Sequence, residues 1–181
     1  MVYLEYMILI NTGNGKGKTT AALGVALRAL GYGKKVVMIQ FIKGPWKSGE
    51  DLFVKECAIA PSKFKIIKMG KGFVGLPGDT LPLREHKKAA QEGLEKAKEL
   101  IASKRYDLVI LDEINNAVDL KLVSAKSVID LLKKVPEQTD VILTGRNAPK
   151  GFIALADTVT EMKEVRHAFT KGKQAKKGID F

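Results

Sequence analysis

The sequence predicts an α/β fold, with a parallel sheet of about six strands and helices on both faces. Two observations support this class. Short apolar runs rich in β-branched residues recur along the chain, and stretches with helical periodicity separate them. The runs are almost continuously apolar, which is typical of parallel strands covered by helices on both sides. This alternation of strands and helices predicts parallel strands joined by crossover helices.

Particular segments carry these two patterns. The expected strands lie near Met7–Asn11, Lys35–Phe41, Phe64–Lys68, Leu108–Asp112, Val141–Thr144 and Val159–Met162. The expected helices lie near Lys18–Leu30, Leu83–Ser103, Ser124–Lys134 and Gly151–Ala156. We expect the first helix to end at Gly31 and Gly33, because glycine readily takes the left-handed conformation common at helix ends.

Length and composition indicate a single domain over residues 1–181. The chain of 181 residues can bury a substantial core without disulfides, and its hydrophobic fraction of 45% is ordinary for a globular protein. The single cysteine, Cys57, has no partner for an internal disulfide and no metal-binding motif around it, so it is expected to be a small buried group. The apolar run Met7–Ile10 is too short to span a bilayer. We therefore expect a cytoplasmic protein with no membrane partner.

The chain is basic, with 31 Lys+Arg against 20 Asp+Glu and a formal net charge of +11. Such a surplus raises the question of an anionic partner, such as a nucleotide, a nucleic acid or an acidic protein. The lysines are scattered among acidic residues along helical segments, as in the stretch 95–99, which is typical of a solvated surface. The pattern therefore favours a solvated surface over a dedicated nucleic-acid surface.

A glycine-rich segment, Gly13–Thr20, stands between the first apolar strand and the first amphipathic helix. Glycines there let successive backbone N–H groups turn toward an anion, and the helix N-terminus adds partial positive charge. Lys18 supplies a full charge, and Thr19 offers a hydroxyl to Mg²⁺. The usual P-loop has glycine where this chain has Thr12, so the segment is a variant of the P-loop NTPase motif. The competing interpretation is an ordinary glycine-rich turn.

Two adjacent carboxylates, Asp112 and Glu113, end another apolar strand. In a parallel sheet this end lies at the same edge as the glycine-rich loop, where ligands bind in open α/β folds. One carboxylate would hold Mg²⁺ directly or through water, and Glu113 could equally activate a nucleophile in a hydrolytic enzyme. Alone, such a pair is more often a helix cap or a solvated turn, but beside the loop it favours a metal site.

Short segments over the whole chain form an ordered set around these motifs. The set comprises Thr12–Gly33, Gln40–Gly44 with Trp46 and Gly49-Glu50, Leu111–Glu113, Leu143–Arg146, Ala156–Glu161, His167–Phe169 and Gly178–Phe181. It resembles the ATP:corrinoid adenosyltransferases of the cobalamin-salvage type almost from end to end. Only the phosphate loop is diagnostic alone, but the ordered set is highly specific.

The resemblance implies a homodimeric enzyme that binds ATP with Mg²⁺ or Mn²⁺ and adenosylates a corrinoid reduced to cobalt(I), releasing triphosphate. It implies a triphosphate site made of Gly13, Asn14, Gly15, Lys16, Gly17, Lys18, Thr19 and Thr20. It further implies a phosphate or ribose contact from Arg28, a corrinoid contact from Phe73 and a metal held by Thr19, Asp112 and Glu113. Relatives use flavodoxin as electron donor, and the basic surplus suits such an acidic partner.

Several positions leave other interpretations open. Arg28 fits equally well as a surface arginine on an amphipathic helix, and Phe73 could simply close a hydrophobic patch. Many relatives carry a second aromatic residue where this chain has Gly75, and a bulky residue where it has Asn116. Corrinoid engagement is therefore expected to differ here.

Two rival functions remain at this point. A P-loop ATPase that binds nucleic acid would use the basic surplus for phosphate contacts and Glu113 as a catalytic base. A regulatory nucleotide-binding module would bind ATP without turnover. The sequence contains no evident arginine finger or aromatic stacking array, so both rank below the adenosyltransferase.

Overall fold

The computed structural model describes residues 6–56, 60–76 and 78–180. Cys57 lies outside the described residues. One sheet of six parallel strands organises the fold, in the order β3-β2-β4-β5-β1-β6. The strands are β1 (Ile8–Thr12), β2 (Val36–Gln40), β3 (Phe64–Lys68), β4 (Leu108–Asp112), β5 (Asp140–Thr144) and β6 (Thr158–Glu161). The predicted parallel sheet is confirmed.

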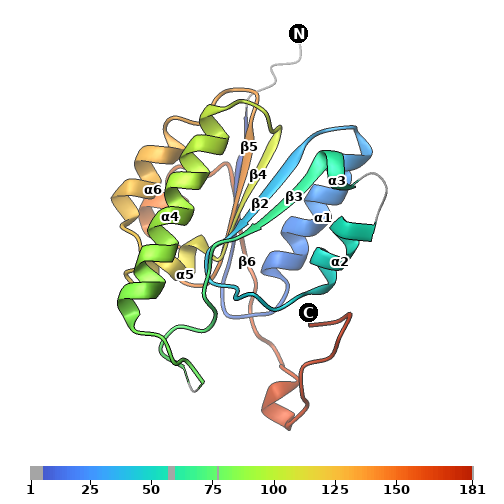
Figure 1. Ribbon diagram of the computed structural model, residues 1–181, viewed down its shortest axis with the longest axis vertical. Helices are drawn as coiled ribbons and strands as arrows, with labels where there is room; N and C mark the ends of the chain where they lie inside the picture. The colour runs from blue at the N-terminus through green and yellow to red at the C-terminus, as the bar shows by residue number, and fades with distance from the viewer. Residues whose placement is uncertain (1–5, 57–59, 77, 181) are drawn as a thin grey trace.

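Helices cover both faces of this sheet, as predicted (Figure 1). One face carries α1 (Lys18–Gly31), α2 (Gly49–Glu56) and α3 (Ala60–Lys63). The other face carries α4 (Leu83–Ala102), α5 (Ile114–Asp119), α6 (Ala125–Leu132) and α7 (Lys150–Ile153). A 3₁₀ turn at Phe169–Lys171 follows the sheet. None of the described helices combines the length and apolarity needed to cross a bilayer.

The sheet separates two hydrophobic clusters, and alternate residues of one strand supply both. In β2, Val37 and Ile39 point into the cluster under α4, whereas Val36 and Met38 point into the cluster under α1. All five residues of β2 are buried, because successive side chains of a strand face opposite sides and both sides are covered. On α1 the contact with the sheet is made by small residues, Ala22 and Ala26, so the helix lies close to the strands.

The element ends differ from the predictions in ways that have local causes. Helix α1 includes Gly31, and only Gly33 takes the left-handed conformation, with φ of 76°. Strand β6 lies at the edge of the sheet and is exposed along its length, so the helices that cover both faces of the sheet do not bury it. Helices α2, α3 and α5 were not predicted. Helix α2 has no buried residue, and α5 follows a left-handed residue instead of a recognisable capping residue.

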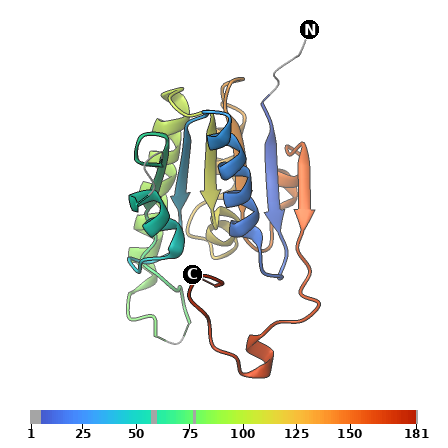
Figure 2. The same cartoon turned by 90° about the vertical axis from the view of Figure 1, so that its right-hand side faces the viewer.

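The parallel strands all point to one edge of the sheet (Figure 2). At that edge lie the loop between β1 and α1, the loops that follow β2 and β3, and the end of β4. The chain after β6 also runs beneath this edge before it reaches the C-terminus (Figure 2). The glycine-rich loop and the carboxylate pair are therefore brought together by the topology.

Candidate functional site

The glycine-rich loop turns from β1 into α1 through two left-handed residues. Gly13 has φ of 95°, and Gly17 caps the helix with φ of 112°. A residue with a Cβ atom is strained at both positions, so glycine is required by the turn itself. Asn14 and Thr20 are exposed to solvent at this loop and at the first turn of α1.

Lys18 lies at the start of α1 and is buried, with only 8% of the residue exposed. Its Nζ donates to the carbonyl oxygen of Gly15 at 2.6 Å, so the ammonium folds over the loop. Burial lowers the pKa of Lys18, although the Glu113 carboxylate partly opposes this effect. The lysine is thus held over the glycine-rich loop at the start of α1.

The chain after β6 packs directly against the loop. The N–H of Gly15 donates to the carbonyl oxygen of Met162 at 2.7 Å. A Cβ atom at Gly13 would lie 2.4 Å from the same oxygen, and one at Gly15 would lie 2.8 Å from the Lys163 backbone. The chain after β6 therefore approaches the loop so closely that glycine is needed at these two positions for packing.

Lys16 is turned toward the C-terminal segment. Its Nζ donates to the carbonyl oxygen of Ile179 at 2.7 Å and forms an ion pair with the Asp180 carboxylate. The hydrogen bond from Lys16 is the main cause of the lowered pKa of Asp180. Lys16 is therefore tied to the C-terminal segment in this structure.

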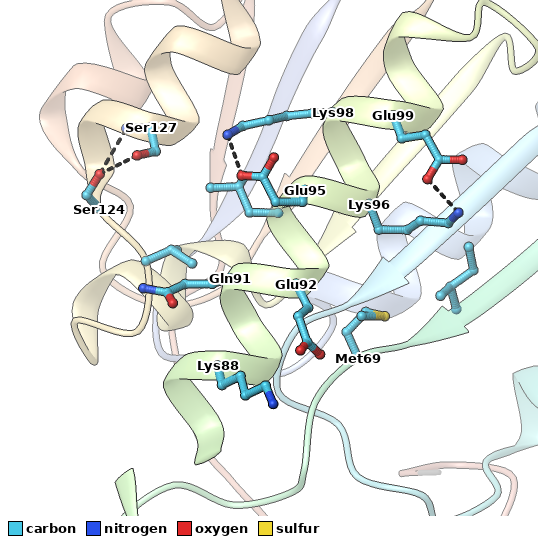
Figure 3. Close-up of a pocket in the computed structure, with 13 residues that line it drawn as sticks. Met69, Lys88, Gln91, Glu92, Glu95, Lys96, Lys98, Glu99, Ser124 and Ser127 are labelled. Carbon is cyan, nitrogen blue, oxygen red and sulfur yellow. Dashed lines mark hydrogen bonds and ion pairs between the residues drawn. The ribbon is translucent and has the colours of Figure 1, made fainter. Parts of the chain in front are cut away.

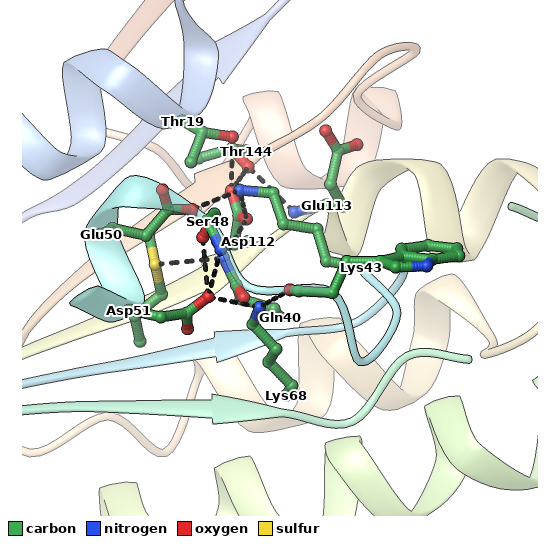
Figure 4. A network of polar contacts seen from close by, with 12 residues as sticks. Thr19, Gln40, Lys43, Ser48, Glu50, Asp51, Lys68, Asp112, Glu113 and Thr144 are labelled. Atoms are coloured by element: carbon green, nitrogen blue, oxygen red, sulfur yellow. Dashed lines mark hydrogen bonds and ion pairs between the residues drawn. The ribbon is translucent and has the colours of Figure 1, made fainter. Parts of the chain in front are cut away.

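Asp112 is fully buried at the end of β4 and collects hydrogen bonds from several elements (Figure 4). Both Thr19 Oγ1 and Thr144 Oγ1 donate to its Oδ1, each at 2.8 Å. Gln40 Nε2 donates to Oδ2 at 3.3 Å. The Asp112–Thr19 bond joins the two motifs that the sequence singled out, and the carboxylate fixes the threonine hydroxyl at the start of α1.

Lys43 completes this network with a charge that the sequence analysis did not assign to the site. Its Nζ lies 2.9 Å from Glu50 Oε1 and 3.4 Å from Asp112 Oδ2 (Figure 4). Although burial disfavours the ammonium, the two carboxylates raise the pKa of Lys43 above its usual value. The buried charge of Asp112 is therefore compensated by Lys43 in this structure, as buried charges require.

Glu113 stands at the turn between β4 and α5 in the left-handed conformation, with φ of 64°. Its N–H donates to Thr144 Oγ1 at 2.9 Å, which anchors the backbone. Its Oε2 is buried and has no hydrogen-bond partner among the residues that the structure describes. Burial, together with the neighbouring Asp112 carboxylate, raises the pKa of Glu113. A strained backbone and a buried unpartnered carboxylate oxygen are typical of a functional site.

Thr12, where the chain departs from the usual P-loop, and Asn116, where it departs from many relatives, both accept hydrogen bonds from backbone N–H groups. Thr12 is buried, and its Oγ1 accepts a hydrogen bond from the Ala148 N–H at 3.2 Å. Asn116 Oδ1 accepts one from the Arg146 N–H at 2.5 Å. The Arg146 charge lies close enough to act on both Lys18 and Glu113. Thr12 and Asn116 therefore hold segments near the loop in place.

Arg28 and Phe73 are not brought into this network. Arg28 is exposed in the last turn of α1, ten residues after Lys18, or about 15 Å along the helix axis. Phe73 is exposed in the loop after β3, at the same edge of the sheet as the glycine-rich loop. Their roles in binding stay predictions.

A divalent cation fits the residues at this edge. Among the residues that the structure describes, no group of three or more His, Cys, Asp or Glu side chains gathers to hold a metal. Mg²⁺ commonly takes only one or two carboxylates from the protein and completes its shell with phosphates and water. The unpartnered Oε2 of Glu113 is open for such a role, whereas both oxygens of Asp112 already accept hydrogen bonds.

A groove of about 900 Å³ lies elsewhere, along α4 (Figure 3). Its charged side chains pair with each other along the helix, as Lys98 does with Glu95 and Lys96 with Glu99, both at 2.7 Å. Such pairs are typical of a solvated helix face. The groove therefore does not compete with the edge of the sheet as the functional site.

The fold and this edge together define a P-loop nucleotide-binding protein. A solved KaiC-like protein, PH0186 from Pyrococcus horikoshii OT3, superposes with a TM-score of 0.53 over 90% of this chain and 75% of that one. The two share 17% sequence identity, so this likeness shows the fold alone.

Sequence comparison identifies the particular family. A family model described as ATP:corrinoid adenosyltransferase BtuR/CobO/CobP matches residues 5–181. A corrinoid adenosyltransferase of Escherichia coli (strain K12) is 40% identical over 175 residues, which cover 97% of this chain and 85% of that protein. The corrinoid adenosyltransferase CobA of Salmonella typhimurium is 38% identical with the same coverage. The chain belongs to the ATP:corrinoid adenosyltransferase family.

Proposed function

We propose that this protein transfers the 5′-deoxyadenosyl group of ATP to the cobalt of a reduced corrinoid. The observation that carries the proposal is the match of residues 5–181 to the adenosyltransferase family. The geometry supports it, because a phosphate loop with the buried Lys18 stands beside Asp112 and Glu113 at one edge of the sheet.

The reaction needs alignment and charge stabilisation more than proton transfer. Cobalt(I) supplies an electron pair to C5′, the cobalt–carbon bond forms, and the C5′–O bond breaks with its electrons on the triphosphate. Cobalt is thereby oxidised to cobalt(III), and no proton has to be removed from the nucleophile. The protein contributes by holding the leaving group with Lys18 and the loop, and by fixing Thr19 through Asp112.

A divalent cation, Mg²⁺ or Mn²⁺, is part of this proposal. Glu113 and the Thr19 hydroxyl would hold it, with Asp112 placing the threonine. When bound, the cation would neutralise charge on the departing triphosphate. A homodimer and a cytoplasmic location stay predictions.

The fate of the phosphates separates this function from ATP hydrolysis. Incubation with MgATP and chemically reduced corrinoid should give the cobalt–carbon product, followed by its absorption spectrum, together with intact triphosphate. A nucleic-acid-binding ATPase would release orthophosphate and bind DNA or RNA in a salt-sensitive manner. A regulatory module would bind ATP without turnover, and either result would overturn the proposal.

Phe73 is expected to matter more for reduction than for transfer. Reduction of cobalt(II) becomes easier when the metal loses its lower axial ligand, and a large apolar side chain against the ring can exclude that ligand and water. We expect Phe73→Ala to slow the reaction from cobalt(II) with a biological reductant about tenfold, and the reaction from chemically prepared cobalt(I) far less. Both rates are measured by formation of the cobalt–carbon product.

Tyr32→Ala is the matched control, because Tyr32 is an exposed aromatic residue beyond the far end of α1. Equal losses in both reactions would mean that Phe73 only shapes the pocket. No loss in either reaction would place Phe73 outside the corrinoid site.

The basic surplus is proposed to dock an acidic electron donor such as flavodoxin. The charge of +11 would steer the donor by long-range attraction. Raising salt from about 10 mM to 0.15 M shortens the screening length from about 30 Å to 8 Å. Donor-dependent turnover should therefore slow several-fold at subsaturating donor, while the reaction from chemically prepared cobalt(I) stays constant. Donor-dependent rates that do not change with salt concentration would contradict docking of the donor by charge.

A further inference from the structure

Two exposed aromatic rings lie together at the edge of the sheet that carries the nucleotide site. Trp46, in the loop after β2, and Phe73, in the loop after β3, have ring centroids 5.8 Å apart with planes tilted by 34°. Each residue is 61% exposed, although large aromatic residues are usually well buried. The pair is therefore a partly apolar surface open to solvent.

Close packing of the two loops puts the rings there. The N–H of Gly72 donates to the Ile42 carbonyl oxygen at 3.0 Å, and that of Gly70 to the Gln40 carbonyl oxygen at 3.1 Å. A Cβ atom at Gly72 would lie 2.7 Å from the Trp46 ring, and Gly72 has φ of 114°. A glycine at this position therefore allows the indole to lie against the loop that carries Phe73.

The loop after β2, which carries Trp46, also reaches the nucleotide site through Lys43. Lys43 contacts Glu50 and Asp112 in the buried network, and Trp46 follows it in the sequence. The Trp46 carbonyl oxygen also accepts a hydrogen bond from Lys68 at the end of β3. Trp46 is thus fixed between the loop of Phe73 and the residues that surround Asp112.

We propose that Trp46 forms the corrinoid-binding surface together with Phe73, supplying the second aromatic ring of that surface. This inference rests on the proposed corrinoid site at Phe73. Phe73 is the only aromatic residue in the segment 69–82, and Gly75 adds no ring. A corrin is a flat macrocycle with a large apolar face, and paired aromatic side chains bind such a face by van der Waals contact. The tilted pair offers more contact area than Phe73 alone.

The test compares corrinoid binding by the ATP-loaded protein and three variants. We expect Trp46→Ala to weaken the binding of cob(II)alamin, followed by its absorption change, about tenfold. Trp46→Phe, which keeps a ring, should stay within about threefold of the wild type. Tyr32→Ala should bind normally, and the Kd for ATP should be unchanged in all three. In the wild type, cob(II)alamin should protect Trp46 but not Tyr32 from hydroxyl-radical oxidation measured by mass spectrometry.

The possible failures are distinguishable. Normal corrinoid binding by Trp46→Ala, or an unprotected Trp46 in a wild type that turns over, overturns this inference and leaves the proposed function standing. A parallel loss of ATP affinity in Trp46→Ala also overturns it, because the indole would then support only the nucleotide site. A wild type that neither binds corrinoid nor forms the adenosyl product overturns the proposed function and this inference together.

Discussion

Lys18→Ala should abolish adenosyl transfer and weaken the binding of MgATP about ten- to a hundredfold. The side chain is buried against the loop, with its Nζ 2.6 Å from the Gly15 carbonyl oxygen. Loss of a charge-assisted contact to a buried anion is typically worth about 1.5–3 kcal/mol, which gives this range of affinity. The effect on rate is larger, since negative charge gathers on the departing triphosphate. Calorimetric titration and the initial rate from cobalt(I) measure the two effects.

Lys34→Ala is the matched control for this change. Lys34 is an exposed lysine just after α1, and its ion pair with Asp140, at 3.4 Å, lies at the opposite edge of the sheet. The Lys34→Ala change removes the same formal charge as Lys18→Ala but leaves the glycine-rich loop unchanged. If Lys18→Ala titrates and turns over like the wild type, Lys18 does not bind the triphosphate.

The fold was predictable from the sequence because most strands are buried on both faces. The run Val36–Gln40 is apolar until its last residue, and all of it is buried. The short helix α5 was not predictable, because its six residues follow a left-handed Glu113 instead of a recognisable capping residue. Its formation depends on tertiary contacts, as the burial of Ile114 and Ala117 shows.

The site was predictable only where its residues are adjacent in the sequence. Lys18, Thr19 and the Asp112-Glu113 pair belong to compact motifs. Gln40 instead reaches Asp112 through the register of β2 and β4, and Thr144 reaches it from the end of β5. Gln40 pairs directly with Asp112 in the β2–β4 register. A polar residue at the end of a buried strand is a signal that could have indicated Gln40.

The contact between Lys43 and Asp112 had no such signal, because it depends on the path of an irregular loop. The sequence shows a lysine three residues after β2, and only the folded loop brings its Nζ to 3.4 Å from Asp112. The Lys43 ammonium would repel a second cation bound next to Asp112. The Lys43 ammonium compensates the buried Asp112 carboxylate, as a buried charge requires.

Glu113→Gln should slow adenosyl transfer about ten- to a hundredfold at low Mg²⁺, and higher Mg²⁺ or Mn²⁺ should restore part of the rate. The amide keeps the shape of the side chain but removes its charge, which acts on the nearby Lys18, from a buried carboxylate. A charged contact of this kind is typically worth about 1.5–3 kcal/mol. Rates from chemically prepared cobalt(I) across a metal titration measure both the loss and the recovery.

The pH dependence of metal binding gives a second readout of the same carboxylate. Burial and the Asp112 charge raise the pKa of Glu113, so its carboxylate takes up a proton at a higher pH than an ordinary glutamate. A metal ligand must be deprotonated, and metal affinity should therefore fall as the pH drops through this raised pKa. In Glu113→Gln the metal affinity should change less with pH. Mn²⁺ binding in the presence of ATP, measured across a pH series, tests this.

Glu99→Gln is the control, because Glu99 is an exposed carboxylate paired with Lys96 on α4, away from the site. It should leave the metal titration unchanged. A base that abstracts a proton would behave differently from a metal ligand, since extra metal could not replace it. If ATP and metal bind normally to Glu113→Gln while added metal restores no activity, the carboxylate acts as a base, and hydrolysis of ATP becomes the better account of this site.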